Sequence, residues 1–171
     1  MNPFDDKQLV EMLGRNRLVN ELFSAGLEVA VPVRDRGIDL IAYADRSDHL
    51  QEFVACPLQI KAATKRSFGL DKKYSKIRGL LIVYVWMLED PAQAETYALT
   101  YDEAFRIAKD AGYTATPSWN NGSYVTNKPG KDLLVQLAPY KMTPEKWRQK
   151  VIPNQKEASC QQKQKASWQL H

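Results

Sequence analysis

Histidine and cysteine are scarce in this sequence, and their scarcity excludes several kinds of chemistry. Each type occurs only twice in 171 residues. Cys56 stands in an apolar segment and Cys160 in a polar one, which indicates neither a disulfide framework nor a zinc knuckle. His49 and His171 have no neighbour at metal-ligand spacing. Histidine-based zinc sites and catalytic triads are therefore not expected.

Long apolar runs are lacking as well. The longest, residues 80–88, suits a buried strand and is far shorter than the roughly 20 residues that a membrane-spanning helix needs. The first residues include Phe4, Asp5 and Asp6 and do not form the basic and then apolar pattern of a secretory signal. We expect a soluble, cytoplasmic protein with no membrane partner.

The composition favours one folded domain. Hydrophobic residues make up 44% of the chain, enough for a single core of ordinary size. We expect that domain to span residues 1–135 and to be followed by a C-terminal helical extension over residues 136–152. Gln, Lys and Ser dominate residues 153–171, which predicts a flexible polar tail.

Hydrophobic periodicity and turn signals predict a mixed α/β fold. A helix is expected over residues 5–25, and a second one, opened by a capping box, over residues 100–111. A third begins at Thr143, with Pro144 in its first position. The expected strands cover residues 27–33, 37–43, 52–62, 80–88 and 97–99, with a hairpin turn at Asn121-Gly122 and a small element over residues 131–137.

Three polar residues on two of these strands could act together. In a strand, alternate side chains share a face, so Gln59 and Lys61 point the same way while Ile60 points into the core. If the strands pair through the turn at residues 44–50, Asp39 lies beside them where the strands separate. A simpler interpretation is an exposed ion pair between Asp39 and Lys61, worth less than about 1 kcal/mol.

This pattern resembles the PD-(D/E)XK nuclease superfamily over residues 11–61. Asp39 and Lys61 match the first acid and the final lysine of the motif, while Gln59 replaces the middle acid. The variant is similar to that of some restriction and intron-encoded homing endonucleases. The resemblance implies a restriction-endonuclease-like α/β (α+β) core, in the order helix, three-stranded antiparallel meander, helix, strand, here with a small C-terminal extension.

The resemblance also implies a metal site. Mg²⁺ or Mn²⁺ prefers oxygen ligands, which the Asp39 carboxylate, the Gln59 side-chain carbonyl and the Ile60 backbone carbonyl could supply. The ion would polarise the phosphate and acidify a water, while Lys61 would position that water or stabilise developing negative charge.

Members of this superfamily often add a carboxylate from the first helix. Glu11 and Glu21 are the two candidates, and they lie about 80° apart around a helix, so both are not expected to serve equally. We favour Glu11 because its distance from Gly26 fits the family pattern better. Arg15 stands where some resolvase-like members carry an acid.

Basic residues follow the motif directly. Residues 61–78 hold seven of them against a single acid, Asp71. Such a run alone could be a solvated surface. In the fold implied by the resemblance, this segment flanks the groove that admits nucleic acid, with Phe68 and Tyr74 packing the second helix or stacking on a base. The residues expected to contact phosphates are Lys65, Arg66, Lys72 and Lys73.

The resemblance therefore implies a Mg²⁺-dependent endodeoxyribonuclease that acts on DNA. It also implies a homodimer or higher homo-oligomer, because cutting both strands of a duplex usually needs two active sites. Gln59 and Arg15 keep an alternative open: a catalytically inactive module that binds nucleic acid or a protein partner. A third hypothesis is a mobile-element accessory protein whose C-terminal tail binds a partner.

Overall fold

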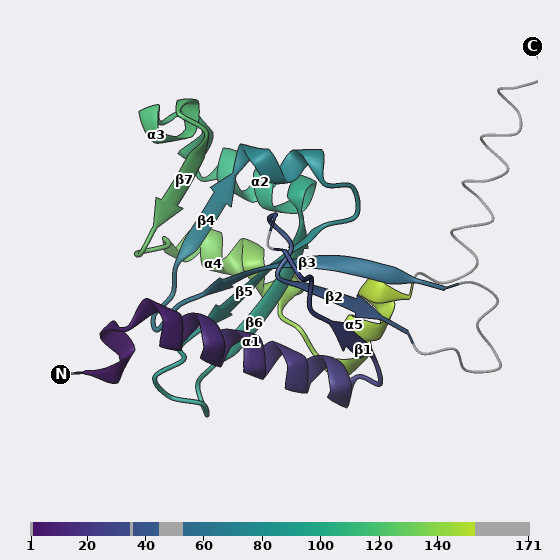
Figure 1. Ribbon diagram of the computed structural model, residues 1–171. Helices are drawn as coiled ribbons and strands as arrows, with labels where there is room; N and C mark the ends of the chain where they lie inside the picture. The colour runs from purple at the N-terminus through teal and green to yellow at the C-terminus, as the bar shows by residue number, and fades with distance from the viewer. Residues whose placement is uncertain (1, 35, 45–52, 153–171) are drawn as a thin grey trace, which may run out of the picture.

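The computed structural model describes residues 2–34, 36–44 and 53–152, and within them the fold is mixed α/β, as predicted (Figure 1). The α-helices are α1 (Lys7–Ser24), α2 (Tyr101–Asp110), α3 (Pro117–Asn120), α4 (Lys131–Leu137) and α5 (Pro144–Val151). The strands are β1 (Glu28–Ala30), β2 (Leu40–Tyr43), β3 (Ala55–Ala62), β4 (Phe68–Asp71), β5 (Leu81–Trp86), β6 (Glu95–Thr100) and β7 (Ser123–Thr126). Short 3-10 helices are η1 (Pro3–Asp5), η2 (Lys72–Lys76), η3 (Tyr113–Ala115) and η4 (Ala138–Tyr140).

The main sheet has five strands in the order β1-β2-β3-β5-β6. β1, β2 and β3 pair antiparallel as the predicted meander, β5 runs parallel to β3, and β6 runs antiparallel to β5. Every residue of β5 is buried, which confirms the buried strand predicted from its apolar run. Part of the turn expected between β2 and β3 lies outside the described residues.

Helix α1 forms where the apolar spacing predicts it. The Asp6 side chain accepts hydrogen bonds from the backbone N–H groups of Gln8 and Leu9, capping the N-terminus. The buried positions recur every four residues, so one stripe of the helix faces the sheet. They are Val10, Gly14, Leu18 and Leu22.

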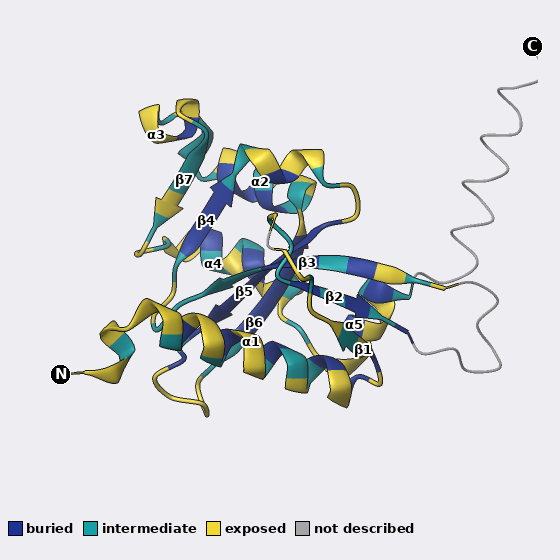
Figure 2. Ribbon diagram, viewed as in Figure 1, coloured by how far each residue is buried: buried dark blue, intermediate teal, exposed yellow. Residues whose placement is uncertain are grey.

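Alternate residues of β5 divide the core between the two faces of the sheet. Leu81, Val83 and Val85 pack with α1 and α5 on one face, whereas Ile82 and Tyr84 pack with α2, α4 and β4 on the other. Figure 2 shows this buried material in the strands and in the inward sides of the helices. The arrangement is three layers with the sheet in the middle.

The predicted α-helix after the meander is wrong. Residues 63–79 instead contain β4 and η2. β4 pairs antiparallel with β7 in a separate two-stranded ribbon, and the Tyr84 hydroxyl donates a 2.8 Å hydrogen bond to the Gly69 carbonyl oxygen. Phe68 of β4 and Tyr74 of η2 are buried in the core on the α2 face of the sheet, where Phe68 stacks on Tyr84.

The hairpin predicted around Asn121-Gly122 is also wrong. Thr116 caps the short helix α3, in which Pro117 takes the first position, so the chain enters the turn from a helix and not from a strand. β7 follows the turn and finds its partner in β4, far back in the sequence. Trp119 is buried there against Phe105.

The predicted capping box of α2 and the predicted start of α5 are confirmed. Thr100 and Glu103 form the capping box of α2, and Thr143 caps α5. Trp147 of α5 packs into the same core as α1. Cys56 is a free, buried cysteine, and burial raises the pKa of its thiol to about 11.

None of the described helices combines the length and the apolar composition that a membrane span requires. Residues 153–171, predicted to be a flexible tail, lie outside the described part.

Candidate functional site

The candidate site lies where β2 and β3 separate. Leu40 is the first residue of β2 and pairs with Leu58, and the Asp39 backbone N–H donates a 2.8 Å hydrogen bond to the Leu58 carbonyl oxygen. Beyond this point β3 continues toward Ala62 without β2 as a neighbour. Asp39 is thus held at the opening of the sheet, as the sequence predicts.

Two hydrogen bonds fix the Asp39 carboxylate on β3. Its Oδ2 accepts one from the Ile60 backbone N–H and one from the Gln59 Nε2, both at 2.6 Å. Gln59 is itself 9% exposed, so this amide is a buried polar group with a charged partner. The contact between Asp39 and Gln59 follows from the register of β2 and β3, which places the two residues side by side.

The orientation of the Gln59 side-chain amide differs from the expected one, in which its carbonyl oxygen would lie beside Asp39 as a metal ligand. Its nitrogen, not its carbonyl oxygen, points at Asp39, while the carbonyl oxygen lies toward Gly37. The same nitrogen also lies 3.3 Å from the Ile60 carbonyl oxygen. In this conformation Gln59 orients Asp39, and it would present oxygen to an ion beside Asp39 only after its amide rotates by about 180°.

Lys61 is not paired with Asp39. Its Nζ lies 5.1 Å from the centroid of the Tyr74 ring, a cation–π contact, and among the described residues it forms no ion pair. The interpretation of Asp39 and Lys61 as a simple cross-strand ion pair is therefore not supported. Lys61 keeps its ammonium group available at the cavity.

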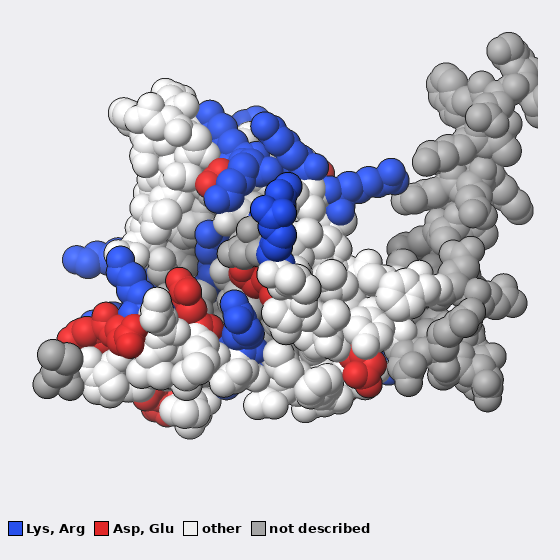
Figure 3. Space-filling view, in the orientation of Figure 1, with Lys and Arg blue, Asp and Glu red and all other residues white. Residues whose placement is uncertain are grey.

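A cavity of about 270 Å³ joins these groups with α1. It is lined by Glu11 and Arg15 of the helix together with Asp39, Gln59, Ile60, Lys61 and Ala62. Figure 3 shows a hollow between α1 and the segment that carries β4 and η2, with acidic and basic side chains inside it. The helix and the separated strands thus bring two carboxylates and two cations to one place.

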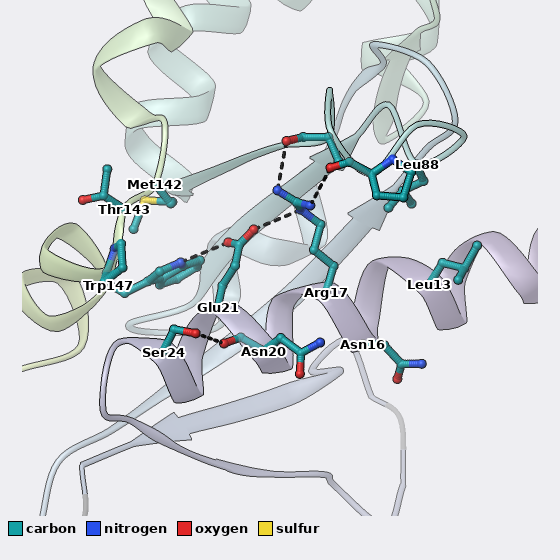
Figure 4. A pocket seen from close by; sticks show the side chains of 13 residues that line it. Leu13, Asn16, Arg17, Asn20, Glu21, Ser24, Leu88, Met142, Thr143 and Trp147 are labelled. Carbon is teal, nitrogen blue, oxygen red and sulfur yellow. Dashed lines mark hydrogen bonds and ion pairs between the residues drawn. The ribbon is translucent and has the colours of Figure 1, made fainter.

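Glu21, the other candidate helix carboxylate, lies elsewhere. It belongs to a different cavity, of about 610 Å³, between α1 and α5 (Figure 4). There it pairs with Arg17 at 3.0 Å and accepts hydrogen bonds from Thr96 and from the Trp147 indole. These contacts give Glu21 a role in joining α1 to β6 and α5, and they leave Glu11 as the helix carboxylate beside Asp39.

The donor atoms around Asp39 suit a hard cation only in part. Glu11 and Asp39 carboxylates and the Ile60 carbonyl are oxygen ligands of the kind that Mg²⁺ prefers. Across residues 2–34, 36–44 and 53–152, however, no group of three His, Cys, Asp or Glu side chains is placed to hold a metal ion. Such a site would carry little negative charge and would depend on backbone and amide oxygens.

The four predicted phosphate contacts do not share one environment. Lys65 is exposed and lines, with Glu11, a 430 Å³ cavity that adjoins the candidate site. Arg66 lines the same cavity but pairs with Glu95 at 3.3 Å. Burial alone would raise the pKa of Glu95, but Lys141 and Arg66 together lower it below its usual value.

The other two lie on η2. Lys72 stands over the Trp119 ring at 5.2 Å, and Lys73 pairs with Asp71 at 3.4 Å. Basic side chains gather above the hollow in Figure 3. Sequence reasoning identified the basic segment but missed Glu95, which pairs with Arg66, and Trp119, whose ring lies under Lys72, because both partners are distant in the chain.

Gln59→Glu tests whether the site can hold a cation. The substitution sets two carboxylates against each other in a buried position, so we expect it to lower the free energy of unfolding by about 2 kcal/mol in EDTA. Mg²⁺ should restore much of that loss by binding between the carboxylates. Thermal unfolding of parent and variant, with and without Mg²⁺, measures both effects.

Gln93→Glu is the matched control. Gln93 donates a 2.9 Å hydrogen bond to Asp90, but both residues are exposed, so water screens the added charge. We expect little change in stability and no response to Mg²⁺. Equal stability of the Gln59→Glu variant in EDTA and in Mg²⁺ would show that no cation binds between positions 39 and 59.

No protein family, curated protein or solved structure matched this chain.

Proposed function

We propose that this chain is a divalent-metal-dependent deoxyribonuclease built on a restriction-endonuclease-like core. The supporting observation is that Glu11, Asp39, Gln59 and Lys61, four residues selected from the sequence, line one cavity. In this proposal the core consists of α1, the meander β1-β2-β3 and β5. The chain departs from the expected order because β4 and η2 replace the helix between β3 and β5.

In the proposed mechanism, Asp39 and Glu11 would hold one Mg²⁺ ion, and the Ile60 carbonyl oxygen would be a further ligand. When bound, the ion supplies Lewis acidity toward a phosphate oxygen and lowers the pKa of a water molecule. The Ile60 N–H and Gln59 fix the orientation of Asp39 through their hydrogen bonds. Such fixed geometry avoids the cost of ordering the ligand during the reaction.

Lys61 contributes positive charge where the phosphate becomes more negative. Its Nζ lies 5.1 Å from the centroid of the Tyr74 ring, and Lys61 lines the cavity, so the ring holds the ammonium group beside the site. A charged donor placed in advance stabilises the transition state more than the ground state. Hydrolysis would attach the water oxygen to phosphorus and break the bond from phosphorus to one ester oxygen, with the water proton passing through solvent to that leaving oxygen and no covalent enzyme intermediate.

The groove beside the site fits a phosphate backbone. Three cavities meet along the end of β3: they share Ala62, and the β4–β7 ribbon lines one of them with Gly69, Asp71, Ser123 and Val125. Lys65 and Arg66 line the cavity toward the start of α1. A duplex lying between α1 and the ribbon would bring a phosphodiester to Asp39 and Lys61.

The nuclease test is nicking of a supercoiled plasmid. We expect the purified protein to convert supercoiled into open-circular DNA in Mg²⁺ or Mn²⁺ and to stop in EDTA. The variant Asp39→Asn, purified in parallel, controls for contaminating nucleases. Failure of the parent to nick plasmid in either metal, although it is folded, would reject the proposed activity.

A second candidate function is supported by two observations. The described residues contain no group of three His, Cys, Asp or Glu side chains placed to hold a metal ion, and the Gln59 side-chain nitrogen donates a hydrogen bond to Asp39. Both fit a module that has kept the nuclease scaffold and its nucleic-acid groove but has lost catalysis. DNA binding by the parent, combined with no nicking in Mg²⁺ or Mn²⁺, would favour this function over the first.

Replacing Lys72 and Lys73 with Ala should weaken the salt dependence of DNA binding. Each phosphate contact contributes about 0.9 to the slope of log affinity against log salt, so the loss should not exceed about 2. A smaller loss is expected because Lys73 already pairs with Asp71. Fluorescence anisotropy with a labelled duplex in EDTA at several salt concentrations gives the slope.

The control for this experiment replaces Lys109 and Lys131, two exposed lysines of α2 and α4. It removes the same charge from another part of the surface. An equal change in slope for both double variants would show that η2 makes no local contact with DNA.

A further inference from the structure

Arg15 is placed to contact a ligand in the candidate site. It stands one helical turn after Glu11 on α1 and lines the 270 Å³ cavity opposite the strand that carries Lys61. Its side chain is exposed at the cavity, and among the described residues it forms no ion pair. Its guanidinium group therefore keeps all its donors for a partner from solution.

Arg17, two residues further on, makes the contrast. It is committed to Glu21 and to the backbone carbonyls of Pro91 and Ala94, which tie α1 to the loop before β6 (Figure 4). The two arginines lie on the same helix and differ in their use. Arg17 holds the fold together, whereas Arg15 makes no comparable contact with the residues that the structure describes.

The charges around the cavity limit what it can hold. Glu11 and Asp39 give two negative charges, and Arg15 and Lys61 give two positive ones. A pair of divalent cations would add four positive charges to a neutral set of side chains. A single divalent cation together with a phosphodiester anion is electrostatically better matched.

We propose that Arg15 binds the non-bridging oxygens of the DNA phosphate in this cavity and serves in place of a second metal ion. The guanidinium plane can donate two parallel N–H groups to a phosphate, which a lysine cannot do. The phosphate is then held from α1 by Arg15 and from β3 by Lys61. This inference rests on the proposed nuclease function for its catalytic part, and on DNA binding alone for its phosphate contact.

The experiment compares Arg15→Gln, Arg15→Lys and Arg106→Gln. Arg106 is an exposed arginine of α2 that does not line the cavity and donates a hydrogen bond to the Tyr140 hydroxyl, so its variant removes the same charge from another part of the surface. Thermal unfolding verifies that all three are folded. Single-turnover nicking in Mg²⁺ gives the rate, and anisotropy of a labelled duplex in EDTA gives the affinity and its salt slope.

We expect Arg15→Gln to lower the nicking rate about 100-fold, the loss typical of one preorganised charge-stabilising donor. Its duplex affinity without metal should fall about tenfold, with a salt slope reduced by about 1. Arg15→Lys should keep the slope but lose about tenfold in rate, since it keeps the charge and loses the paired donors. Arg106→Gln should resemble the parent in every measurement.

The outcomes separate this inference from the nuclease proposal. If the parent nicks DNA and Arg15→Gln nicks equally fast, the inference is overturned and the nuclease stands. If the parent binds without nicking and Arg15→Gln alone weakens binding, the phosphate contact stands and the nuclease fails. If Arg15→Gln binds like Arg106→Gln, or the parent does not bind DNA, the inference is overturned whatever the activity.

Discussion

Asp39→Asn is expected to reduce plasmid nicking by at least about 1,000-fold. The substitution keeps the shape of the side chain but removes the charge that would hold the metal ion, and metal-assisted stabilisation is worth several kcal/mol in such sites. Asn can still accept both hydrogen bonds through its carbonyl oxygen, because the Ile60 N–H and the Gln59 amide donate to the same Asp39 oxygen, but a neutral oxygen is the weaker acceptor. We therefore expect a loss of only about 1 kcal/mol in folding free energy.

Activity and binding must be measured separately for this variant. Single-turnover nicking in Mg²⁺ gives the rate, and anisotropy in EDTA should show duplex binding equal to or tighter than that of the parent, because one negative charge has gone. Asp90→Asn is the control, since Asp90 is an exposed acceptor for Ala92 and Gln93 in a loop. Undiminished nicking by Asp39→Asn would show that Asp39 takes no part in the reaction. Equal losses of nicking in Asp39→Asn and Asp90→Asn would show that the loss does not depend on the position of Asp39.

How far the sequence predicts this site depends on which contacts are local. Asp39 and Gln59 lie on adjacent strands of a meander, so pairing and two-residue alternation were enough to bring them together. The hydrogen bond from the Ile60 N–H to Asp39 also follows from that geometry. The orientation of the Gln59 amide does not follow from the strand geometry. Its oxygen accepts and its nitrogen donates hydrogen bonds, so the orientation depends on the neighbouring groups.

The parts that sequence reasoning missed depend on distant partners. Phe68 and Leu70 lie two residues apart, a spacing that puts both side chains on one face of a strand. That spacing does not identify the partner strand β7, which lies more than fifty residues away in the chain. Tyr74 beneath Lys61 and Glu95 beside Arg66 are likewise non-local. Short segments with ambiguous periodicity take their structure from tertiary contacts, whereas α1 and α2 carry their own capping signals.

Gly14→Leu is expected to destabilise the protein by about 3 kcal/mol. A Cβ atom at position 14 would lie 2.5 Å from the Cβ of Ala62 in β3 and 3.5 Å from Leu88, so α1 packs on the sheet through a bare backbone. Even Gly14→Ala, which should gain about 1 kcal/mol of helix propensity, is expected to lose stability on balance. Chemical denaturation measures both, with Asn16→Ala, an exposed position on the same helix, as the neutral control.

Gly14→Ala should also affect the candidate site, because Glu11 and Arg15, which line the cavity, lie near Gly14 on α1. Moving the helix away from β3 would draw both side chains back from Asp39, so we expect Gly14→Ala to lose nicking activity in excess of its loss of folded protein. Ala62→Gly in the Gly14→Ala background removes the opposing Cβ and should recover part of the stability and the activity. Recovery of stability without activity would mean that the position of α1 does not control the site, and that Glu11 and Arg15 take no part in it.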